Sequence, residues 1–459
     1  MSTTAVSTLP WQHALVVGLG ASGLAAARLL LELGVRVRGY DQRDEVAELP
    51  GGLEPFVGAT APPAAAFAGV DGVVISPGVP PEPIRALAGQ HAPDAEIVGE
   101  LSLGFRVLHA LAPTSPRVVL VTGTNGKSTV TALVGHLLRT DGRDAFAGGN
   151  LGTPVCTLVS EAHAGKRAWP EDLVVECSSF QLETYEPMPT AVAMVLNVTP
   201  DHLDRYPHMQ AYAATKARVF SGLTAGDLAL LDAEDEWAAH IAPTSGPRVA
   251  FVGRDEDANL HGTGSGDALI LAGDPPYPRE DLRLAGRHNA RNALFALLAA
   301  RHLGVSPQTC RAGLASFEGL PHRMAFVREL EGVRWYNDSK ATNVASALAS
   351  LGGLDEAFVL IAGGKAKGDD LSPLGELVSR RARGLVAIGE AASGFAALGR
   401  EAGVPTTTAS SMAEAVQAAR TLARPGDAIV LAPACASFDQ YRSYAHRGEM
   451  FTAAVHELS

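Results

Sequence analysis

The sequence predicts an α/β protein made of three doubly wound units, in which parallel strands alternate with helices. Short apolar runs of β type are followed by helical runs along the whole chain of 459 residues. Two glycine-rich loops each stand between such a strand and a helix. Because a domain usually takes about 100–200 residues, this length favours two to four domains. We place the three units at residues 1–111, 112–316 and 317–459.

Composition indicates several packed cores and no nucleic-acid surface. Apolar residues make up 47 % of the chain, the net charge is −12, and no Lys/Arg-rich block occurs. Four cysteines lie far apart without a CxxC pair, which indicates buried thiols in a reducing compartment. The sequence contains neither a signal-peptide pattern nor an apolar run of the ~18 residues that span a bilayer. We therefore expect a soluble, cytoplasmic protein that does not bind membranes.

The first unit carries a G-x-G-x-x-G pattern at residues 18–23. A strand at residues 13–17 precedes it, and a helix at 24–33 and a second strand at 35–40 follow, with Asp41 after the second strand. Glycines in this setting let the backbone approach a diphosphate closely. A UDP-type ligand, NAD(P) and purely structural glycines all agree with the pattern. We favour a UDP-type ligand, because the unit is too small for a full dinucleotide domain and a second phosphate loop follows it.

A further strand of the first unit, at residues 72–75, ends in Ser76-Pro77-Gly78. Ligands of open α/β sheets bind at the carboxyl ends of strands, so this turn is a candidate ligand contact. The alternative is an ordinary Pro-Gly turn.

The central unit begins with a strand at residues 118–121, the loop TGTNGKST at 122–129 and a helix at 130–138. Backbone N–H groups of such a loop point at a bound triphosphate, and the helix dipole favours the anion. Lys127 would reach the β- and γ-phosphates, and the hydroxyl of Ser128 would bind Mg²⁺. The loop departs from the general P-loop, which has a glycine where this chain has Val121. A glycine turn before a surface helix is the alternative.

Polar residues follow two further strands of the central unit. The strand at residues 173–175 leads to Glu176, a carboxylate that could hold the Mg²⁺ of a phosphate site. The strand at 192–196 leads to a segment with His202, close to acidic residues. Taken alone, Glu176 would be a solvated charge and His202 a structural residue.

Four more candidates come from helices and a glycine pair of the central unit. Asn150 follows two glycines behind a short strand, and Lys216 lies on a helix predicted at residues 211–220. Asn289 and Asn292 stand three apart before a helix at 293–303, where they could hold an adenosine or act as caps. Lys216 alone would be a surface charge.

The last unit repeats the alternation of strands and helices. Strands are expected at residues 333–336, 358–362, 385–388 and 428–431, and helices at 344–351, 391–398 and 412–422. Polar strings follow three of the strands. Because the carboxyl ends of parallel strands meet at one edge, a small polar ligand is expected there.

Eight strings in this order resemble the Mur ligase family over nearly the full chain. They read TGTNGKST, GGN, ECSSFQLE, NVTPDHLDRY, GRHNARNA, LPHRM, NDSKATN and PACASFDQ. SSFQLE and NDSKATN are typical of the branch that adds D-glutamate. The resemblance implies a Rossmann-like UDP-binding domain, a central P-loop ATPase-like domain and a Rossmann-like amino-acid-binding domain.

The resemblance also implies the reaction, in which ATP drives the joining of D-glutamate to UDP-N-acetylmuramoyl-L-alanine through an acyl phosphate. Such a ligase serves peptidoglycan precursor synthesis, and so cell shape and cell division. It would use two Mg²⁺ ions with ATP as co-substrate, and we expect a monomer.

The residues implied for the UDP substrate come from the glycine loop and four later segments: Ala21, Ser22, Asp41, Gln42, Arg43, Gly78, Asn150 and His202. Those implied for ATP are Gly123, Thr124, Asn125, Gly126, Lys127, Ser128, Thr129, Asn289, Asn292, Arg323 and Asp338. Those implied for D-glutamate are Thr342, Lys367, Ser437 and Tyr444.

Four residues are implied in catalysis: Lys127, His202, Lys216 and Arg323. Metal ligation is implied for Ser128, Glu176, His202 and Lys216, the last as a carbamate, because CO₂ turns its amine into an anionic group.

Three alternatives stay open at this stage. A sibling Mur ligase or a folylpolyglutamate synthase would add another amino acid. A dinucleotide-dependent oxidoreductase would use the first glycine loop, and a nucleotide-binding module would lack catalysis.

Overall fold

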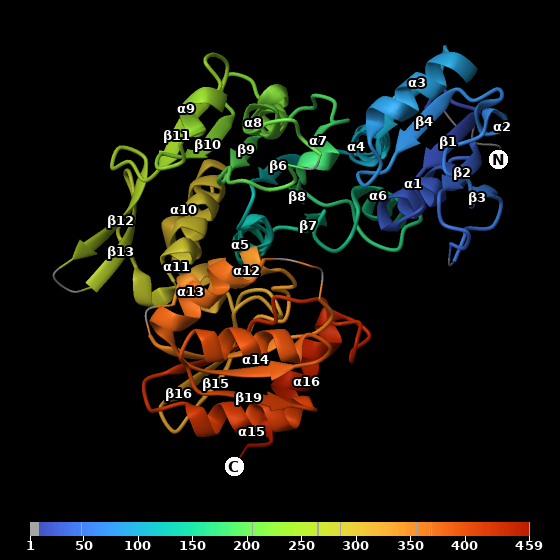
Figure 1. Cartoon of the computed structure of the whole chain (residues 1–459). Coiled ribbons are helices and arrows are strands. Elements are labelled where there is room, and N and C mark those ends of the chain that lie inside the picture. The colour runs from blue at the N-terminus through green and yellow to red at the C-terminus, as the bar shows by residue number, and fades with distance from the viewer. Residues whose placement is uncertain are drawn as a thin grey trace. The chain divides into compact units, whose positions relative to one another are not determined.

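The computed structural model describes residues 9–46, 48–203, 205–263, 266–284, 286–354, 356–366, 368 and 370–458 (Figure 1). The chain divides into two compact units, one of Met1–Pro278 with Arg291–Leu314, the other of Arg279–Ala290 with Ala315–Ser459. The described strands form two sheets in the first unit and one in the second. The placement of domain boundaries after residues 111 and 316 remains a prediction from the sequence. Within the described residues, no helix is both long and apolar enough to pass through a bilayer.

The first sheet has five parallel strands in the order β3-β2-β1-β4-β5. Its strands are β1 (His13–Val17), β2 (Arg36–Asp41), β3 (Glu54–Val57), β4 (Gly72–Ile75) and β5 (Glu96–Gly99). Its helices are α1 (Ala21–Glu32), α2 (Ala64–Phe67), α3 (Pro81–His91) and α4 (Glu100–Leu111).

Alternate residues of β1 enter different cores. Val16 packs into the cluster that holds residues of α1 and α4, whereas Leu15 and Val17 join residues of α2 and α3. Because side chains of a strand point alternately to its two faces, the sheet is apolar on both sides. The result is the doubly wound arrangement that the sequence predicts.

The second sheet has nine strands in the order β14-β13-β12-β11-β10-β9-β6-β8-β7. Its parallel strands are β6 (Arg117–Thr122), β7 (Ala145–Gly149), β8 (Asp172–Glu176), β9 (Val192–Val195), β10 (Leu228–Asp232) and β11 (Arg248–Val252). The next strand, β12 (Ala258–Thr263), pairs with β11 and is parallel to it. Two antiparallel strands, β13 (Gly266–Leu271) and β14 (Tyr277–Pro278), extend the edge.

The helical segments of this part of the chain are α5 (Lys127–Thr140), α6 (Val155–His163), α7 (Ser179–Leu182), α8 (Met209–Ala217), η1 (Arg218–Gly222), α9 (Ala238–Ile241), η2 (Arg279–Asp281), α10 (Arg287–His302) and α11 (Pro307–Ser316). A capping box starts α7, since Ser178 accepts from the N–H of Gln181 and the Gln181 side chain accepts from the N–H of Ser178.

The third sheet has six strands in the order β15-β16-β20-β17-β18-β19. They are β15 (Ala325–Leu330), β16 (Val333–Asn337), β17 (Phe358–Gly363), β18 (Ala382–Ile388), β19 (Thr406–Ala409) and β20 (Ala428–Leu431). Only the β15–β16 pair among the described pairs of this sheet is antiparallel. The helices are α12 (Val344–Gly352), α13 (Ser372–Arg381), α14 (Ala392–Glu401), α15 (Met412–Leu422) and α16 (Tyr444–His456).

The predicted α/β class with three mainly parallel sheets is confirmed. Several boundaries differ from the prediction: α5 begins at Lys127 rather than at residue 130, and α10 begins at Arg287 rather than at 293. Both helices start within polar strings, because backbone hydrogen bonds begin before the apolar pattern does.

Candidate functional site

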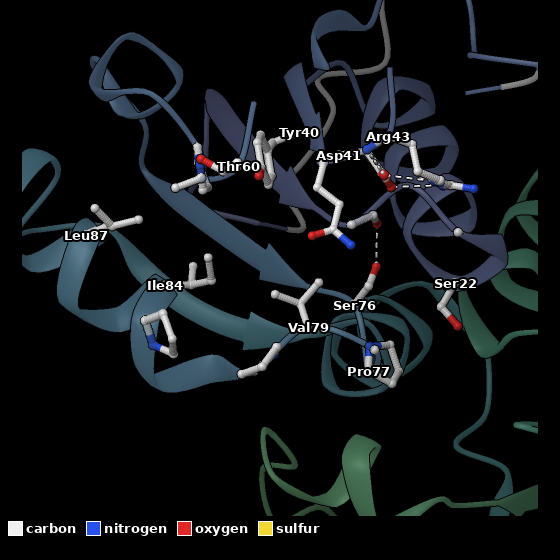
Figure 2. Close-up of a pocket in the computed structure, with 18 of the residues that line it drawn as sticks. Ser22, Tyr40, Asp41, Arg43, Thr60, Ser76, Pro77, Val79, Ile84 and Leu87 are labelled. Atoms are coloured by element: carbon white, nitrogen blue, oxygen red, sulfur yellow. Dashed lines mark hydrogen bonds and ion pairs between the residues drawn. The ribbon is translucent and has the colours of Figure 1, made fainter. Parts of the chain in front are cut away.

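A pocket of about 620 Å³ lies at the carboxyl ends of the strands of the first sheet (Figure 2). Ile84 and Leu87 lie at one end of the pocket, and Ser22 and Arg43 at the other. Seven of the eight residues expected to bind the UDP substrate line it: Ala21, Ser22, Asp41, Gln42, Arg43, Gly78 and Asn150. The eighth, His202, is not among the lining residues. The pocket therefore offers an apolar end and a polar end to one elongated ligand.

Asp41 and Arg43 form a closed polar pair at the end of β2. Both carboxylate oxygens of Asp41 are engaged, by the N–H of Leu19 at 2.8 Å and by the N–H, Nε and Nη2 of Arg43 at 3.0, 2.8 and 2.9 Å. Hydrogen bonds from Arg43 lower the pKa of Asp41 to about 2. With four bonds accepted, the carboxylate has little capacity left for a ribose 2′-hydroxyl, the contact that an NAD site requires.

The glycine loop is held close to the next strand. Gly18 has a φ of +87°, and a Cβ on Gly23 would lie only 1.8 Å from the carbonyl oxygen of Gly18. The hydroxyl of Ser76 donates to the same carbonyl oxygen at 2.5 Å. Only glycine fits these two positions, and the Ser76 turn fixes the loop that would face a diphosphate.

The second glycine loop joins β6 to α5. Gly123 and Gly126 have φ values of +149° and +84°. Asn197 secures the loop: its side chain accepts from the N–H of Asn125 at 2.8 Å and donates to the carbonyl of Asn125 at 3.1 Å. A Cβ on Gly126 would lie 2.5 Å from Oδ1 of Asn292, so Asn292 contacts the loop directly. This is the strand, loop and helix arrangement that holds phosphates.

Two lysines converge on this loop. Nζ of Lys127 donates to the carbonyls of Gly123 and Thr124 at 3.0 and 2.7 Å, and Nζ of Lys216 donates to the carbonyl of Gly123 at 2.8 Å. Lys216 is only 1 % exposed, and its ammonium lies 4.4 Å from the centre of the Tyr212 ring. Burial, with the charge of Lys127 as a second cause, lowers the pKa of Lys216 to about 7. A substantial fraction of its amine is therefore neutral and nucleophilic near neutral pH.

Glu176 connects the loop region with the pocket. It is the last residue of β8, 3 % exposed, and its Oε1 accepts from Nδ2 of Asn150 at 2.7 Å. Its Oε2 is buried and has no hydrogen-bond partner among the described residues. A buried carboxylate oxygen without a partner costs free energy unless a cation binds it, so Glu176 fits a Mg²⁺ ligand.

Within the described part of the chain, no group of three or more His, Cys, Asp or Glu side chains has the arrangement of a metal site. Mg²⁺ at a phosphate site takes most of its ligands from phosphates and water, so one carboxylate and one hydroxyl suffice. Ser128, which is 5 % exposed at the start of α5, has the hydroxyl that such a site would need.

His202 lies beside the aromatic residues that border the phosphate loop. Its φ is +53°, and its ring centre lies 4.6 Å from that of Phe180 and 6.5 Å from that of Tyr212. The Tyr212 hydroxyl in turn lies 3.3 Å from Oγ1 of Thr124. A non-glycine residue with positive φ is held there by its surroundings, which is common at functional sites.

In the second unit, Arg323 and Asp338 occupy one region. Oδ1 of Asp338 accepts from the N–H of Met324 at 3.1 Å. Burial raises the pKa of Asp338 to about 7, and the positive charge of Arg323 opposes this rise. Asn289, in the same unit, is 7 % exposed.

Three of the residues expected to bind D-glutamate, Thr342, Ser437 and Tyr444, come after β16 or β20 in the chain. The N–H of Ala434 donates to the carbonyl of Ala341 at 2.9 Å, beside Thr342, and Ser437 is 2 % exposed. The hydroxyl of Ser339 donates to the carbonyl of Tyr444 at 2.8 Å. Thus the two polar strings meet, as the shared edge of parallel strands predicts. Lys367 lies outside the described residues.

Arg447 links these two strings by hydrogen bonds, a role that was not predicted from the sequence. It is 1 % exposed and makes five hydrogen bonds, to the hydroxyl and carbonyl of Ser339, twice to the carbonyl of Cys435 and once to that of Ala436. All five N–H groups of a guanidinium are thereby used. Arg447 stands four and eight residues before Phe451 and Val455, which are buried on the same helix, and this spacing is the signal that could have identified it.

Tyr212 was also missed, although it stands four residues before Lys216 on α8 and so shares its helix face. That spacing is the signal that could have identified it.

Family models match three consecutive parts of the chain. The Mur ligase MurD-like N-terminal domain matches residues 12–99, the Mur ligase middle domain residues 121–300, and the Mur ligase glutamate ligase domain residues 322–435.

Curated relatives match over nearly the whole length. The chain is 41 % identical to the UDP-N-acetylmuramoylalanine–D-glutamate ligase of Thiobacillus denitrificans, covering 98 % of this chain and 97 % of the relative. It is 43 % identical to the ligase of the same name from Anaeromyxobacter dehalogenans, covering 95 % and 96 %.

Solved structures share the fold. UDP-N-acetylmuramate-alanine ligase MurC from Thermotoga maritima superimposes with a TM-score of 0.59 at 17 % identity, covering 97 % of this chain and 99 % of that one. MurF from Acinetobacter baumannii gives a TM-score of 0.57 at 18 % identity, covering 94 % and 87 %. With three family models along its length and relatives of about 40 % identity, the chain belongs to the Mur ligase family.

Proposed function

We propose that this protein is an ATP-dependent ligase that joins D-glutamate to UDP-N-acetylmuramoyl-L-alanine and releases ADP and phosphate, in peptidoglycan precursor synthesis. The relatives of about 40 % identity carry the name of this activity, and the MurD-like N-terminal model agrees with it. ATP and a UDP-linked precursor would place the reaction in the cytoplasm, with the protein acting as a monomer.

One observation carries the proposal: Lys127 and Lys216 both donate to the carbonyl of Gly123 in the phosphate loop, while Asn150 joins that region to the pocket through Glu176. Asn150 and Glu176 therefore join a site for a phosphate donor to a site for a UDP-linked acid, through the side-chain hydrogen bond and a second one from the N–H of Asn150 to the carbonyl of Glu176 at 2.9 Å. This linkage would hold the phosphate donor and the acid near each other, and such proximity favours phosphoryl transfer.

The chemistry follows from the weakness of a carboxylate as an electrophile. Its anionic oxygen cannot leave, whereas the phosphate of an acyl phosphate can. Both the phosphoryl transfer and the later attack by an amine concentrate negative charge on oxygen atoms. Lys127 and the loop N–H groups would stabilise that charge in the first step, with Arg323 as a further cation from the second unit.

Ser128 and Glu176 would hold one Mg²⁺, and His202 with a carbamate on Lys216 would hold a second. When bound, these ions supply charge neutralisation at the phosphates. The lowered pKa of Lys216 supports carbamate formation, because CO₂ reacts with the neutral amine.

The second unit would bind the nucleotide through Asn289 and Asp338 and the incoming amino acid through Thr342 and Ser437, with Lys367 and Tyr444 as further contacts. Asp338 would titrate near neutral pH and could serve as an acceptor for a ribose hydroxyl.

The experiment mixes protein, ATP and Mg²⁺ with UDP-N-acetylmuramoyl-L-alanine and measures ADP release with D-Glu, L-Glu, L-Ala, L-Lys or diaminopimelate. Turnover that depends on D-Glu supports the proposal. Turnover with another amino acid would favour a sibling ligase, and retention of NAD after purification would favour an oxidoreductase.

A further inference from the structure

Arg205 lies where the wall of the pocket meets the segment that carries His202. Its Nη2 donates at 3.2 Å to the main-chain oxygen of Val79, a residue that lines the pocket. The same guanidinium binds Glu183 in a bidentate ion pair, with Nε–Oε1 and Nη2–Oε2 distances of 3.2 and 2.5 Å. The two side chains are only 16 % and 13 % exposed. One partly buried group thus joins three segments that are distant in sequence.

On the pocket side, the contact reaches the first glycine loop. The N–H of Val79 donates to the carbonyl of Ser76 at 2.9 Å, and the hydroxyl of Ser76 donates to the carbonyl of Gly18. Figure 2 shows Val79 and Ser76 next to each other on the wall of the pocket. Val79 and the loop that faces the ligand are therefore joined, so that they would move together as one wall of the pocket.

On the other side, the contact reaches the phosphate loop. The guanidinium of Arg205 lies 4.8 Å from the centre of the Phe180 ring, and Phe180 contacts the ring of His202. His202 packs against Tyr212, whose hydroxyl lies beside Thr124. The series of contacts therefore runs from the pocket wall to the loop that would hold the phosphates.

We propose that Arg205 is a positioning residue that fixes the pocket wall relative to His202 and the phosphate loop, so that the acid of a substrate held in the pocket meets the phosphate donor at a reactive distance. The inference rests on the proposed function. Its side chain contacts Val79, Glu183 and Phe180, so the role we assign to Arg205 is positioning rather than catalysis.

The geometry requires arginine rather than any cation. A planar guanidinium can bind both carboxylate oxygens of Glu183 and still direct a third N–H to Val79. Lysine is a point charge on a flexible chain and cannot hold both partners in fixed directions. Misplacement of reactants by about 1 Å can cost about 10²-fold in rate, so the loss should appear in kcat rather than in substrate affinity.

The test compares Arg205→Lys and Arg205→Met with Arg218→Met as matched control. Arg218 donates to the carbonyls of Glu183 and Tyr185. It therefore holds the same segment as Arg205, but neither of these bonds reaches the pocket wall. The measurements are kcat, the KM for UDP-N-acetylmuramoyl-L-alanine, the Kd for UDP by calorimetry, and thermal unfolding.

For both Arg205 variants we expect kcat to fall by about 10–100-fold, while KM and the Kd for UDP change less than about threefold. A third variant, Arg205→Ala, serves for chemical rescue, and guanidinium ion added to it should restore part of kcat. Arg218→Met should keep a kcat near that of the wild type.

An unchanged kcat in Arg205→Met would overturn the inference, as would equal losses in the Arg205 and Arg218 variants. A fall in activity that only matches the fraction unfolded would also overturn it. A wild type that releases no ADP with its substrates would instead contradict the proposed function itself.

Discussion

Replacing Glu100 by Gln should stabilise the protein at pH 8 and change its stability little at pH 4. Glu100 begins α4 and is 1 % exposed. Its Oε1 accepts from the N–H of Cys156 at 3.0 Å, while its Oε2 has no hydrogen-bond partner among the described residues. This carboxyl group is buried without a countercharge in contact, so ionisation there is unfavourable.

The magnitude follows from the pKa. Burial raises the pKa of Glu100 from 4.5 to about 6. In the unfolded chain the carboxyl group ionises near pH 4.5. The raised pKa in the folded state means that the neutral carboxyl group favours folding fully below pH 4.5, and that this contribution to the free energy of unfolding is lost as pH rises through about 6. At about 1.4 kcal/mol per pKa unit, the ionised group costs the folded state about 2 kcal/mol at pH 8. Since the Gln amide also lacks one partner, we expect a gain of about 1–2 kcal/mol.

The assay is urea unfolding of wild type and Glu100→Gln at pH 4, 6 and 8, followed by circular dichroism. The difference in the free energy of unfolding should grow from near zero at pH 4 to about 1–2 kcal/mol at pH 8. A difference that is independent of pH, or a variant that is less stable at pH 8, would refute the reasoning.

Three further substitutions test the site. Lys127→Ala should lower ligase turnover by at least about 10²-fold while calorimetry shows unchanged binding of UDP; full turnover would remove its role at the phosphates. Lys216→Ala should be inactive and partly rescued by short carboxylic acids, and wild-type activity without them would contradict the carbamate. Arg447→Lys should lower the free energy of unfolding by about 2 kcal/mol or more, because three donors replace five. It should also raise the KM for D-glutamate without changing ADP release in the first half-reaction, and an unchanged KM would disprove its role in ordering that pocket.

The alternation of apolar strands and helices was sufficient to predict the α/β class and many of the parallel strands. The strands β4 and β20 and the helix α15 have the predicted bounds. The edge strands β14 and β15 were not predicted, because β14 has only two residues and charged residues interrupt the apolar pattern of β15. Arg328, for example, stands within β15.

The candidate site was predictable where glycine patterns fix the backbone. Gly18 and Gly126 have the positive φ values that their patterns require, and the residues expected near UDP line one pocket. The roles of Arg205 and Arg447 could not be predicted, because each depends on carbonyl groups of segments distant in sequence. The sequence does not show which distant carbonyl groups a buried arginine will meet.

The most direct test of the central claim follows an oxygen atom. UDP-N-acetylmuramoyl-L-alanine labelled with ¹⁸O in its carboxylate is turned over with ATP and D-glutamate, and the released phosphate is analysed by mass spectrometry. If the phosphate loop activates the acid as an acyl phosphate, each phosphate released carries one oxygen from the substrate carboxylate. Unlabelled phosphate accompanying amide formation would contradict the account.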